Sequence, residues 1–260
     1  MDINLDTFKK NGYVNIGNVL NYDEIQTLKN EVLNNLNDNN NKLRFSKNLI
    51  LENQKFFSLL VNSKIISSIK FLCNNKNIFF TPHTDTHINL RAGTIHRDNR
   101  HSDRVFGIGN DWRESEQNYN VFRIAIYLTS YQESKTSLTV FPGTHKNETT
   151  YQNIWFRFFN KIVRNIHKFF PLIQINQYAP FIKKKILKVN PGDCIIFDKR
   201  LRHAGGKISN HADKIAIFFS YGEAENIHTI NDFNYLKSNN YITNYPKTLQ
   251  NLFKINNIKY

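Results

Sequence analysis

The sequence has only two cysteines, Cys73 and Cys194, among 260 residues. They lie far apart, outside any CxxC or histidine-rich motif, so neither a disulfide framework nor a zinc site is predicted, and a reducing, cytoplasmic setting fits best. No run of 18 apolar residues occurs, and the opening MDINLDTFKKNGYV has no apolar stretch of the kind found in signal peptides. These absences exclude an obvious membrane span and favour a soluble or peripheral protein.

Aromatic residues, by contrast, are plentiful. The 21 Phe and 12 Tyr, within a hydrophobic share of 40%, supply a core and argue against global disorder. The length predicts a single domain over residues 1–260. No internal repeat is visible, and no RNA-binding or helix-turn-helix signature suggests a specific nucleic-acid partner. The sequence gives no indication of the oligomeric state.

The net charge of +14 is unevenly distributed along the chain. More than half of the excess lies between residues 151 and 191, where no acid occurs. The basic residues of this segment are Arg157, Lys161, Arg164, Lys168, Lys183, Lys184, Lys185 and Lys188. An anionic partner would explain this excess, but so would an AT-rich coding sequence, which favours Lys, Asn and Ile together.

The pattern of apolar residues predicts a helical N-terminal part, residues 1–75, and a β-rich core, residues 76–230. Helices are expected over 22–36 and over 54–73, the latter with a break near Asn62. Short β-branched or aromatic runs, separated by turn residues, then predict a sandwich or barrel against which the helices pack. These runs are 77–81, 86–96, 121–129, 137–141, 183–189, 193–198 and 214–222. The tail, 231–260, shows no clear periodicity.

A His-x-Asp pair followed by a distant histidine is the motif with chemical content. Iron(II) that activates dioxygen needs two imidazoles and one carboxylate on one face of the metal. Residues i and i+2 at the end of a strand point to the same side, so a His-x-Asp pair can supply two of these ligands from one segment. Three pairs occur, at positions 83 and 85, 96 and 98, and 101 and 103. The pair His96–Asp98 is favoured, because it closes the expected strand 86–96, whereas the first pair begins a strand and the third lies within a loop. Each pair taken alone is better explained as a solvated polar pair in a loop, and it is the context that favours His96–Asp98.

The third ligand is expected to be His203, which follows the turn and strand of PGDCIIFDKRLRHAGG. In isolation it would fit a surface histidine as well. The segments 8–32, 96–98, 127–146 and 192–206, in this order, resemble the phytanoyl-CoA dioxygenase family of iron(II)/2-oxoglutarate oxygenases. The resemblance covers most of residues 8–222 and implies a double-stranded β-helix, a jelly-roll or cupin-like core. It also implies that His96, Asp98 and His203 hold Fe(II), with 2-oxoglutarate and O2 as co-substrates.

The same resemblance implies a hydroxylase that acts on an unidentified small-molecule, lipid or carrier-bound substrate and releases succinate and CO2. Hydroxylation is favoured over halogenation, because related halogenases have a small residue in place of Asp98. The family's arginine for 2-oxoglutarate, eleven positions after the distal histidine, is replaced by Lys214. A lysine keeps the charge but loses the bidentate geometry, so Arg123 is an alternative anchor. The family's hydroxyl donor two positions after the distal histidine is replaced by Gly205.

The basic insert, residues 147–188, carries apolar residues at helical spacing from Trp155 to Phe170. Three interpretations stay open: a lid over the active site, a helix that contacts an anionic membrane through residues 152–170, or an amphipathic helix packed on the barrel. If it is a lid, Trp155 and Phe159 are expected to contact the substrate. Arg97 and Arg100 lie in the basic loop that follows the His96–Asp98 pair, where an anionic group of the substrate could bind, and ordinary solvated loop charge explains them equally well.

The competing hypothesis for the whole chain is a non-catalytic jelly-roll protein. Such a protein would attach to an anionic membrane, a glycan or nucleic acid through the basic insert.

Overall fold

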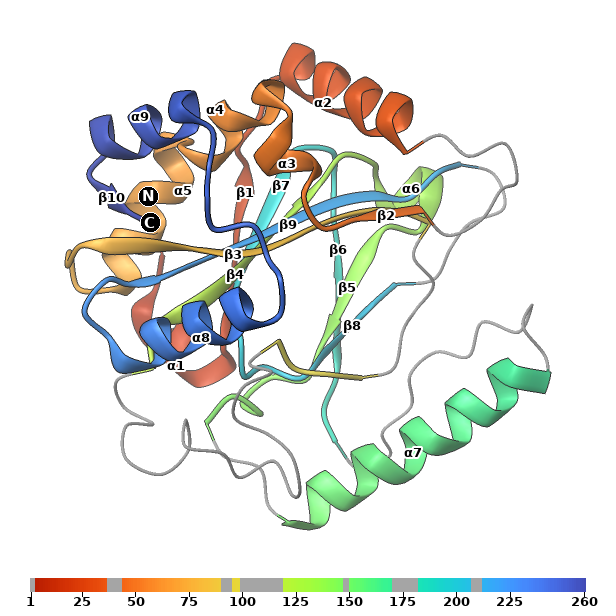
Figure 1. Cartoon of the computed structure of the whole chain (residues 1–260). Coiled ribbons are helices and arrows are strands. Elements are labelled where there is room, and N and C mark those ends of the chain that lie inside the picture. The colour runs from red at the N-terminus through yellow and green to blue at the C-terminus, as the bar shows by residue number, and fades with distance from the viewer. Residues whose placement is uncertain are drawn as a thin grey trace.

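The structure is a computed structural model that describes residues 3–36, 44–89, 95–98, 119–146, 150–169, 182–206 and 212–260. Two mainly antiparallel sheets form its core (Figure 1). The larger sheet has the order β1-β7-β4-β9-β3-β10, with β2 also paired to β3. Its strands are β1 (Tyr13–Asn18), β2 (Arg44–Ser46), β3 (Ile78–Ile88), β4 (Val121–Tyr127), β7 (Asp193–Asp198), β9 (Ile215–Glu223) and β10 (Ile258–Lys259). The smaller sheet has the order β6-β5-β8, from β5 (Ser137–Val140), β6 (Lys185–Lys188) and β8 (His203–Gly205).

The alternation of side chains along β4 explains how one strand serves two layers. Ile124 and Ile126 join the cluster formed with the helices, whereas Ala125 and Tyr127 join a second cluster with residues of the smaller sheet, including Leu138. All seven residues of β4 are buried. The larger sheet therefore lies between a helical layer and the smaller sheet, and this arrangement confirms the predicted jelly-roll core.

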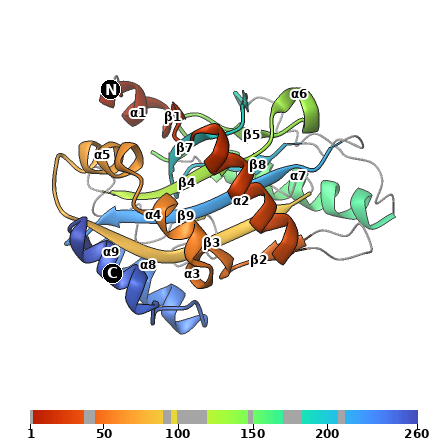
Figure 2. The same ribbon diagram turned by 90° about the horizontal axis from the view of Figure 1, so that it is seen from above.

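The helices between β1 and β3 supply the outer layer, and Figure 2 shows them lying over the larger sheet. They are α2 (Tyr22–Asn35), α3 (Leu49–Glu52), a 3-10 turn η1 (Gln54–Phe56), α4 (Phe57–Leu60) and α5 (Ser63–Leu72), and α1 (Leu5–Asn11) precedes β1. Helix α2 begins with a reciprocal capping box between Asn21 and Glu24, which satisfies two backbone N–H groups. The helix predictions for 22–36 and 54–73 are confirmed, including the break at Asn62. The strands β1 and β2 within the first 75 residues were not predicted.

Two further sequence expectations need correction. The strand expected over 86–96 is the end of a longer strand, β3, which stops at Ile88, and residues 90–94 lie outside the described part. The tail is ordered as α8 (Ile227–Ser238), α9 (Lys247–Ile255) and β10, which pairs parallel to β3. Tyr245 and Phe253 of this tail pack edge-on or tilted against Phe80 of β3.

The remaining helices are the single turn α6 (Tyr131–Ser134) and α7 (Thr150–Phe169), which occupies much of the basic insert. Helix α7 lies beside the smaller sheet (Figure 1). It is attached there by Phe156, which is fully buried against Phe141, Ile95 and Ala204. Among the described residues, no helix has the length and apolarity needed to span a bilayer.

Candidate metal centre

Two histidines that are distant in sequence are brought together by a backbone bridge. His96 and His203 form an isolated antiparallel β-bridge, in which each backbone N–H donates to the carbonyl of the other residue over 3.0 Å. Residues joined in this way project their side chains to the same side. The two imidazole rings lie accordingly with their centroids 4.4 Å apart.

Asp98 completes the group. Its backbone N–H donates to the carbonyl of Lys199 over 2.8 Å, and its carboxylate oxygens lie 3.7 Å from Nε2 of each histidine. One ligand atom from each of the three residues lies within 4.8 Å of the others. Asp98 and His203 are buried, whereas the side chain of His96 is 46% exposed. The structure thus brings together the three residues that the sequence predicted.

The tautomer of His203 is set by a hydrogen bond between its Nδ1 and the backbone carbonyl of Leu201. Its Nδ1 lies 2.9 Å from the carbonyl of Leu201, which can only accept, so Nδ1 carries the proton and Nε2 keeps a lone pair directed toward Asp98. Two imidazole nitrogens and one carboxylate are the donor set of the two-histidine, one-carboxylate triad that holds non-haem iron(II). The residues present therefore fit an iron site.

The electrostatics of the cluster favour the forms that bind a metal. Burial raises the pKa of the Asp98 carboxyl, but the nearby His203 and Arg123 outweigh it and hold that pKa well below the usual value. Burial, reinforced by His96, lowers the pKa of His203 to about 4. At neutral pH the group is therefore a carboxylate beside a neutral imidazole, as metal coordination requires.

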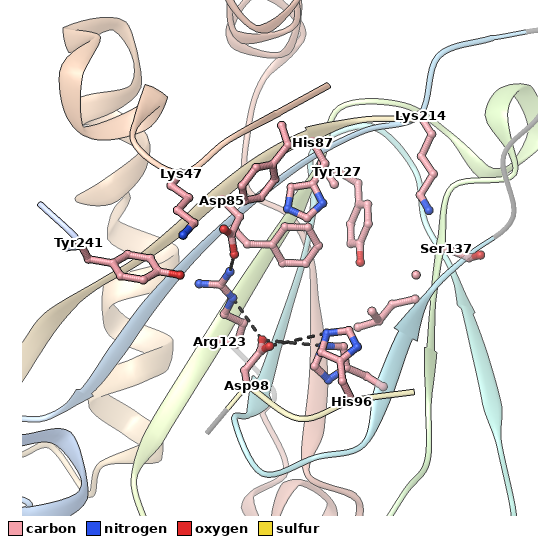
Figure 3. A pocket seen from close by; sticks show the side chains of 16 residues that line it. Lys47, Asp85, His87, His96, Asp98, Arg123, Tyr127, Ser137, Lys214 and Tyr241 are labelled. Atoms are coloured by element: carbon pink, nitrogen blue, oxygen red, sulfur yellow. Dashed lines mark hydrogen bonds and ion pairs between the residues drawn. The ribbon is translucent and has the colours of Figure 1, made fainter. Parts of the chain in front are cut away.

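The three residues line one wall of a cavity of about 270 Å³ that lies between the larger and the smaller sheet. Figure 3 shows two further groups of side chains around it. Lys214, Tyr127 and Ser137 lie on one side of the histidines, and Lys47, Tyr241 and Asp85 lie on the other. The cavity therefore has two polar ends with the candidate ligands between them.

Lys214 is the cation at the first end. The residue is buried and immediately precedes β9, and its Nζ donates to the carbonyl of Gly206 over 2.8 Å. Burial lowers its pKa from 10.5 to about 8. A buried ammonium that is this costly to hold is well suited to a negatively charged ligand.

Arg123 of β4 lies on the side of Asp98 away from Lys214, and its guanidinium contacts several protein groups. Its guanidinium donates to the carbonyl of His83 and to the Asp85 carboxylate, and it lies 3.2 Å from the hydroxyl of Ser220. Its Nε is 3.3 Å from the Asp98 carboxylate (Figure 3). Arg123 therefore bridges two carboxylates, one of them in the candidate metal centre.

The family model for phytanoyl-CoA dioxygenase (PhyH) matches residues 58–216, more than half of the chain. The chain belongs to the phytanoyl-CoA dioxygenase family. Family and fold together indicate a non-haem iron enzyme that depends on 2-oxoglutarate. No curated protein matches the sequence.

Several solved structures are similar in fold to this member of the phytanoyl-CoA dioxygenase family. HygX from Streptomyces hygroscopicus, with nickel, 2-oxoglutarate and hygromycin B bound, is 16% identical with a TM-score of 0.62, over 85% of this chain and 86% of that chain. The α-ketoglutarate-dependent epimerase SnoN from nogalamycin biosynthesis is 12% identical with a TM-score of 0.58, over 85% and 82%. The carbocyclase SnoK from the same biosynthesis is 14% identical with a TM-score of 0.58, over 85% and 83%.

Three of the four residues predicted to contact the substrate do not line the cavity of this phytanoyl-CoA dioxygenase family member. Arg97 is buried but does not line the cavity. Trp155 and Phe159 stack on one another along α7, with ring centroids 5.2 Å apart, and neither lines the cavity. Arg100 lies outside the described residues, as do His101 and Asp103. The lid role of α7 stays a prediction.

Other residues of the cavity were missed by the sequence reasoning. Tyr127 and Arg123 share one face of β4, four residues apart, and the buried hydroxyl of Tyr127 has no hydrogen-bond partner among the described residues. Asp85 lies in the middle of β3, not at the start of a strand, and belongs to a pair that was set aside. The alternation of polar residues along β3 and β4 was the available signal. No pattern in the sequence of the tail pointed to Tyr241 as a residue of the cavity.

Proposed function

We propose that this chain is an Fe(II)- and 2-oxoglutarate-dependent dioxygenase that hydroxylates a small molecule and releases succinate and CO2. In this proposal His96, Asp98 and His203 hold the iron, and O2 is the second co-substrate. The observation that carries the proposal is the placement of three ligand atoms within 4.8 Å of one another on the wall of a cavity that a buried lysine also lines. When bound, iron with chelated 2-oxoglutarate supplies the activation of dioxygen and the removal of a hydrogen atom from the substrate.

Lys214 is assigned to the far carboxylate of 2-oxoglutarate. It lies on the same cavity as the ligands and carries a positive charge in a buried environment, where an ion pair is strong. The unpartnered hydroxyl of Tyr127 lies at the same end and is the natural second donor to that carboxylate. Together they replace the forked arginine and the hydroxyl that other members of the family have.

Arg123 is assigned a positioning role instead of the anchoring role that the sequence left open. Its guanidinium contacts both the Asp85 and the Asp98 carboxylates and donates to the carbonyl of His83. Releasing it to bind 2-oxoglutarate would leave two buried carboxylates without their cation, which is costly. We therefore expect Arg123 to orient the Asp98 carboxylate toward the metal.

The opposite end of the cavity is assigned to the substrate. Lys47 lies over the ring of Tyr241, with Nζ 4.9 Å from the ring centroid, and Asp85 lies near both (Figure 3). Phe218 and Leu138 add apolar surface to the lining of the cavity. This combination of a cation, a carboxylate and aromatic rings suits a small polar molecule, and HygX was solved with such a molecule, hygromycin B.

Anaerobic addition of Fe(II) and 2-oxoglutarate tests the proposal. The wild type should develop the visible charge-transfer band of iron-bound 2-oxoglutarate, and His96→Ala and His203→Ala should abolish it. His145→Gln is the matched control, since His145 is a buried histidine that does not line the cavity. Retention of the band in either ligand variant would disprove the assignment.

Admission of dioxygen then tests turnover and reaction type. We expect succinate release that a substrate stimulates, and oxygen from labelled O2 in the organic product. Succinate without label in the product would indicate an epimerase- or carbocyclase-like outcome, as in SnoN and SnoK, in place of hydroxylation. No band and no succinate would leave the non-catalytic binding protein as the explanation.

A further inference from the structure

In the part of the chain that the structure describes, one side of helix α7 holds its buried side chains and its hydrogen bonds to Ile95. Phe156 is fully buried and Val163, seven residues later, is 6% exposed. Between them Asn160 makes two hydrogen bonds with the backbone of Ile95, accepting from its N–H over 3.1 Å and donating to its carbonyl over 2.8 Å. Positions i, i+4 and i+7 share one face of a helix, so this face is the attached one.

The opposite side of α7 exposes large apolar side chains. Ile154 and Phe158 are each 53% exposed, and Phe169 is 71% exposed. They recur at i, i+4 and i+15, which places them in one strip along the helix. Packing among the described residues does not explain these exposed phenylalanines, which together form an apolar surface of the kind found at interaction sites.

A basic strip runs beside the apolar one. Arg157, Lys161 and Lys168 are exposed, and their spacing of four and seven residues aligns them along the helix. Helix α7 contains no acidic residue. The surface is therefore apolar and cationic at once.

We propose that this surface of α7 docks onto a membrane that contains anionic lipid. Side chains such as Phe158 enter the boundary between headgroups and acyl chains, and the adjoining Arg and Lys side chains bind lipid phosphates. The charge decides between occupants. A second copy of this chain would place one cationic strip against another, whereas an anionic bilayer matches the strip along the whole helix. The proposal is independent of the chemistry proposed for the metal centre.

The first test is sedimentation of the full chain with vesicles of phosphatidylcholine, with and without phosphatidylglycerol. We expect binding to the anionic vesicles only. Phe158→Ser should weaken it roughly tenfold, and the double variant Lys161→Gln/Lys168→Gln roughly 30-fold. The matched controls are Ile227→Ser, an exposed apolar residue of α8, and the double variant Lys9→Gln/Lys10→Gln on α1, for which we expect changes within about twofold.

A second readout reports insertion directly. The chain has two tryptophans, so Trp112→Phe leaves Trp155 of α7 as the single emitter. Its fluorescence should shift to the blue with anionic vesicles and be quenched by brominated lipid. The proposal fails if the wild type does not bind anionic vesicles, or if the α7 variants bind as the controls do. It also fails if the wild type does not bind vesicles but forms a dimer through α7, shown by dissociation of that dimer in Phe158→Ser.

Discussion

The buried lysine at one end of the cavity should make 2-oxoglutarate binding depend on pH in a way that an arginine would not. In the free protein the pKa of Lys214 is about 8 because of burial. Below that pH the ammonium is already present and binding takes up no proton. Above it, the neutral amine must first gain a proton, so the affinity for 2-oxoglutarate should fall about tenfold for each further pH unit. Between about pH 7 and about pH 9, we expect the dissociation constant to rise roughly tenfold.

Calorimetry with the nickel-loaded protein measures this, because nickel avoids oxidation during the titration. Lys214→Arg is the control, since its guanidinium stays charged and any remaining dependence then comes from the metal or the buffer. The other titratable side chains near this end do not interfere. Burial, reinforced by Arg123, lowers the pKa of His87 to about 3, and burial raises that of Tyr127 above its usual value. Equal slopes for the wild type and Lys214→Arg would refute the assignment.

The same depressed pKa has a consequence for stability without ligand. The unfolded chain holds a proton on Lys214 up to about pH 10.5, and the folded chain only to about 8. Stability should therefore rise as pH increases through this window, by up to about 3 kcal/mol. At neutral pH Lys214→Met should remove this cost, at the expense of contacts that include the hydrogen bond to Gly206, so we expect the variant to be more stable than the wild type. Thermal unfolding at two pH values checks both the sign and the window.

Three further predictions concern the surroundings of the ligands. Arg123→Lys keeps the charge but cannot bridge two carboxylates, so we expect the affinity for the metal to be roughly 10–100-fold weaker, measured by competition with a chelating dye. An unchanged affinity would contradict the role of Arg123 in orienting Asp98. Asn160→Ala should weaken metal binding about tenfold through the backbone next to the exposed histidine, whereas Asn165→Ala, on the solvent side of the same helix, should leave it unchanged. Phe156→Ala should reduce the free energy of unfolding by about 3–5 kcal/mol in a denaturant titration, and a loss below about 0.5 kcal/mol would show that α7 is not anchored by this ring.

The sequence predicted those site residues that belong to local motifs or follow one at a fixed spacing. His96 and Asp98 belong to a short motif, His203 lies just past a turn and a strand that resemble those of the family, and Lys214 follows His203 at the family's spacing of eleven, so the sequence pointed to all four. The reason given for His96–Asp98, a strand that runs to residue 96, was nevertheless wrong, because β3 ends at Ile88. The backbone bridge between the two histidines, which no local pattern encodes, holds the pair in place.

The residues that were missed depend on strand register and on long-range packing. Tyr127 faces the cavity because β4 alternates between two layers, which cannot be known before the sheet order is known. Helix α8 gave no apolar period, since its buried positions are mostly polar, among them His228, Thr229 and Asp232. Asp232 is there to pair with the fully buried Lys199. Local patterns predict helices with an apolar stripe well, and they miss a helix that is held by an ion pair.

The bridge from Asp85 through Arg123 to Asp98 has one consequence for how this protein handles its metal. The carboxylate ligand is buried, and its cationic partner Arg123 lies 3.3 Å away. The two main hydrophobic clusters of the core contain none of the three ligands, so we expect that the fold does not depend on the metal as a zinc finger does. Chelators should strip the ion and leave a folded protein that can be reloaded. A cell that runs short of iron would thus keep a stock of intact apoprotein, ready for the metal when it returns.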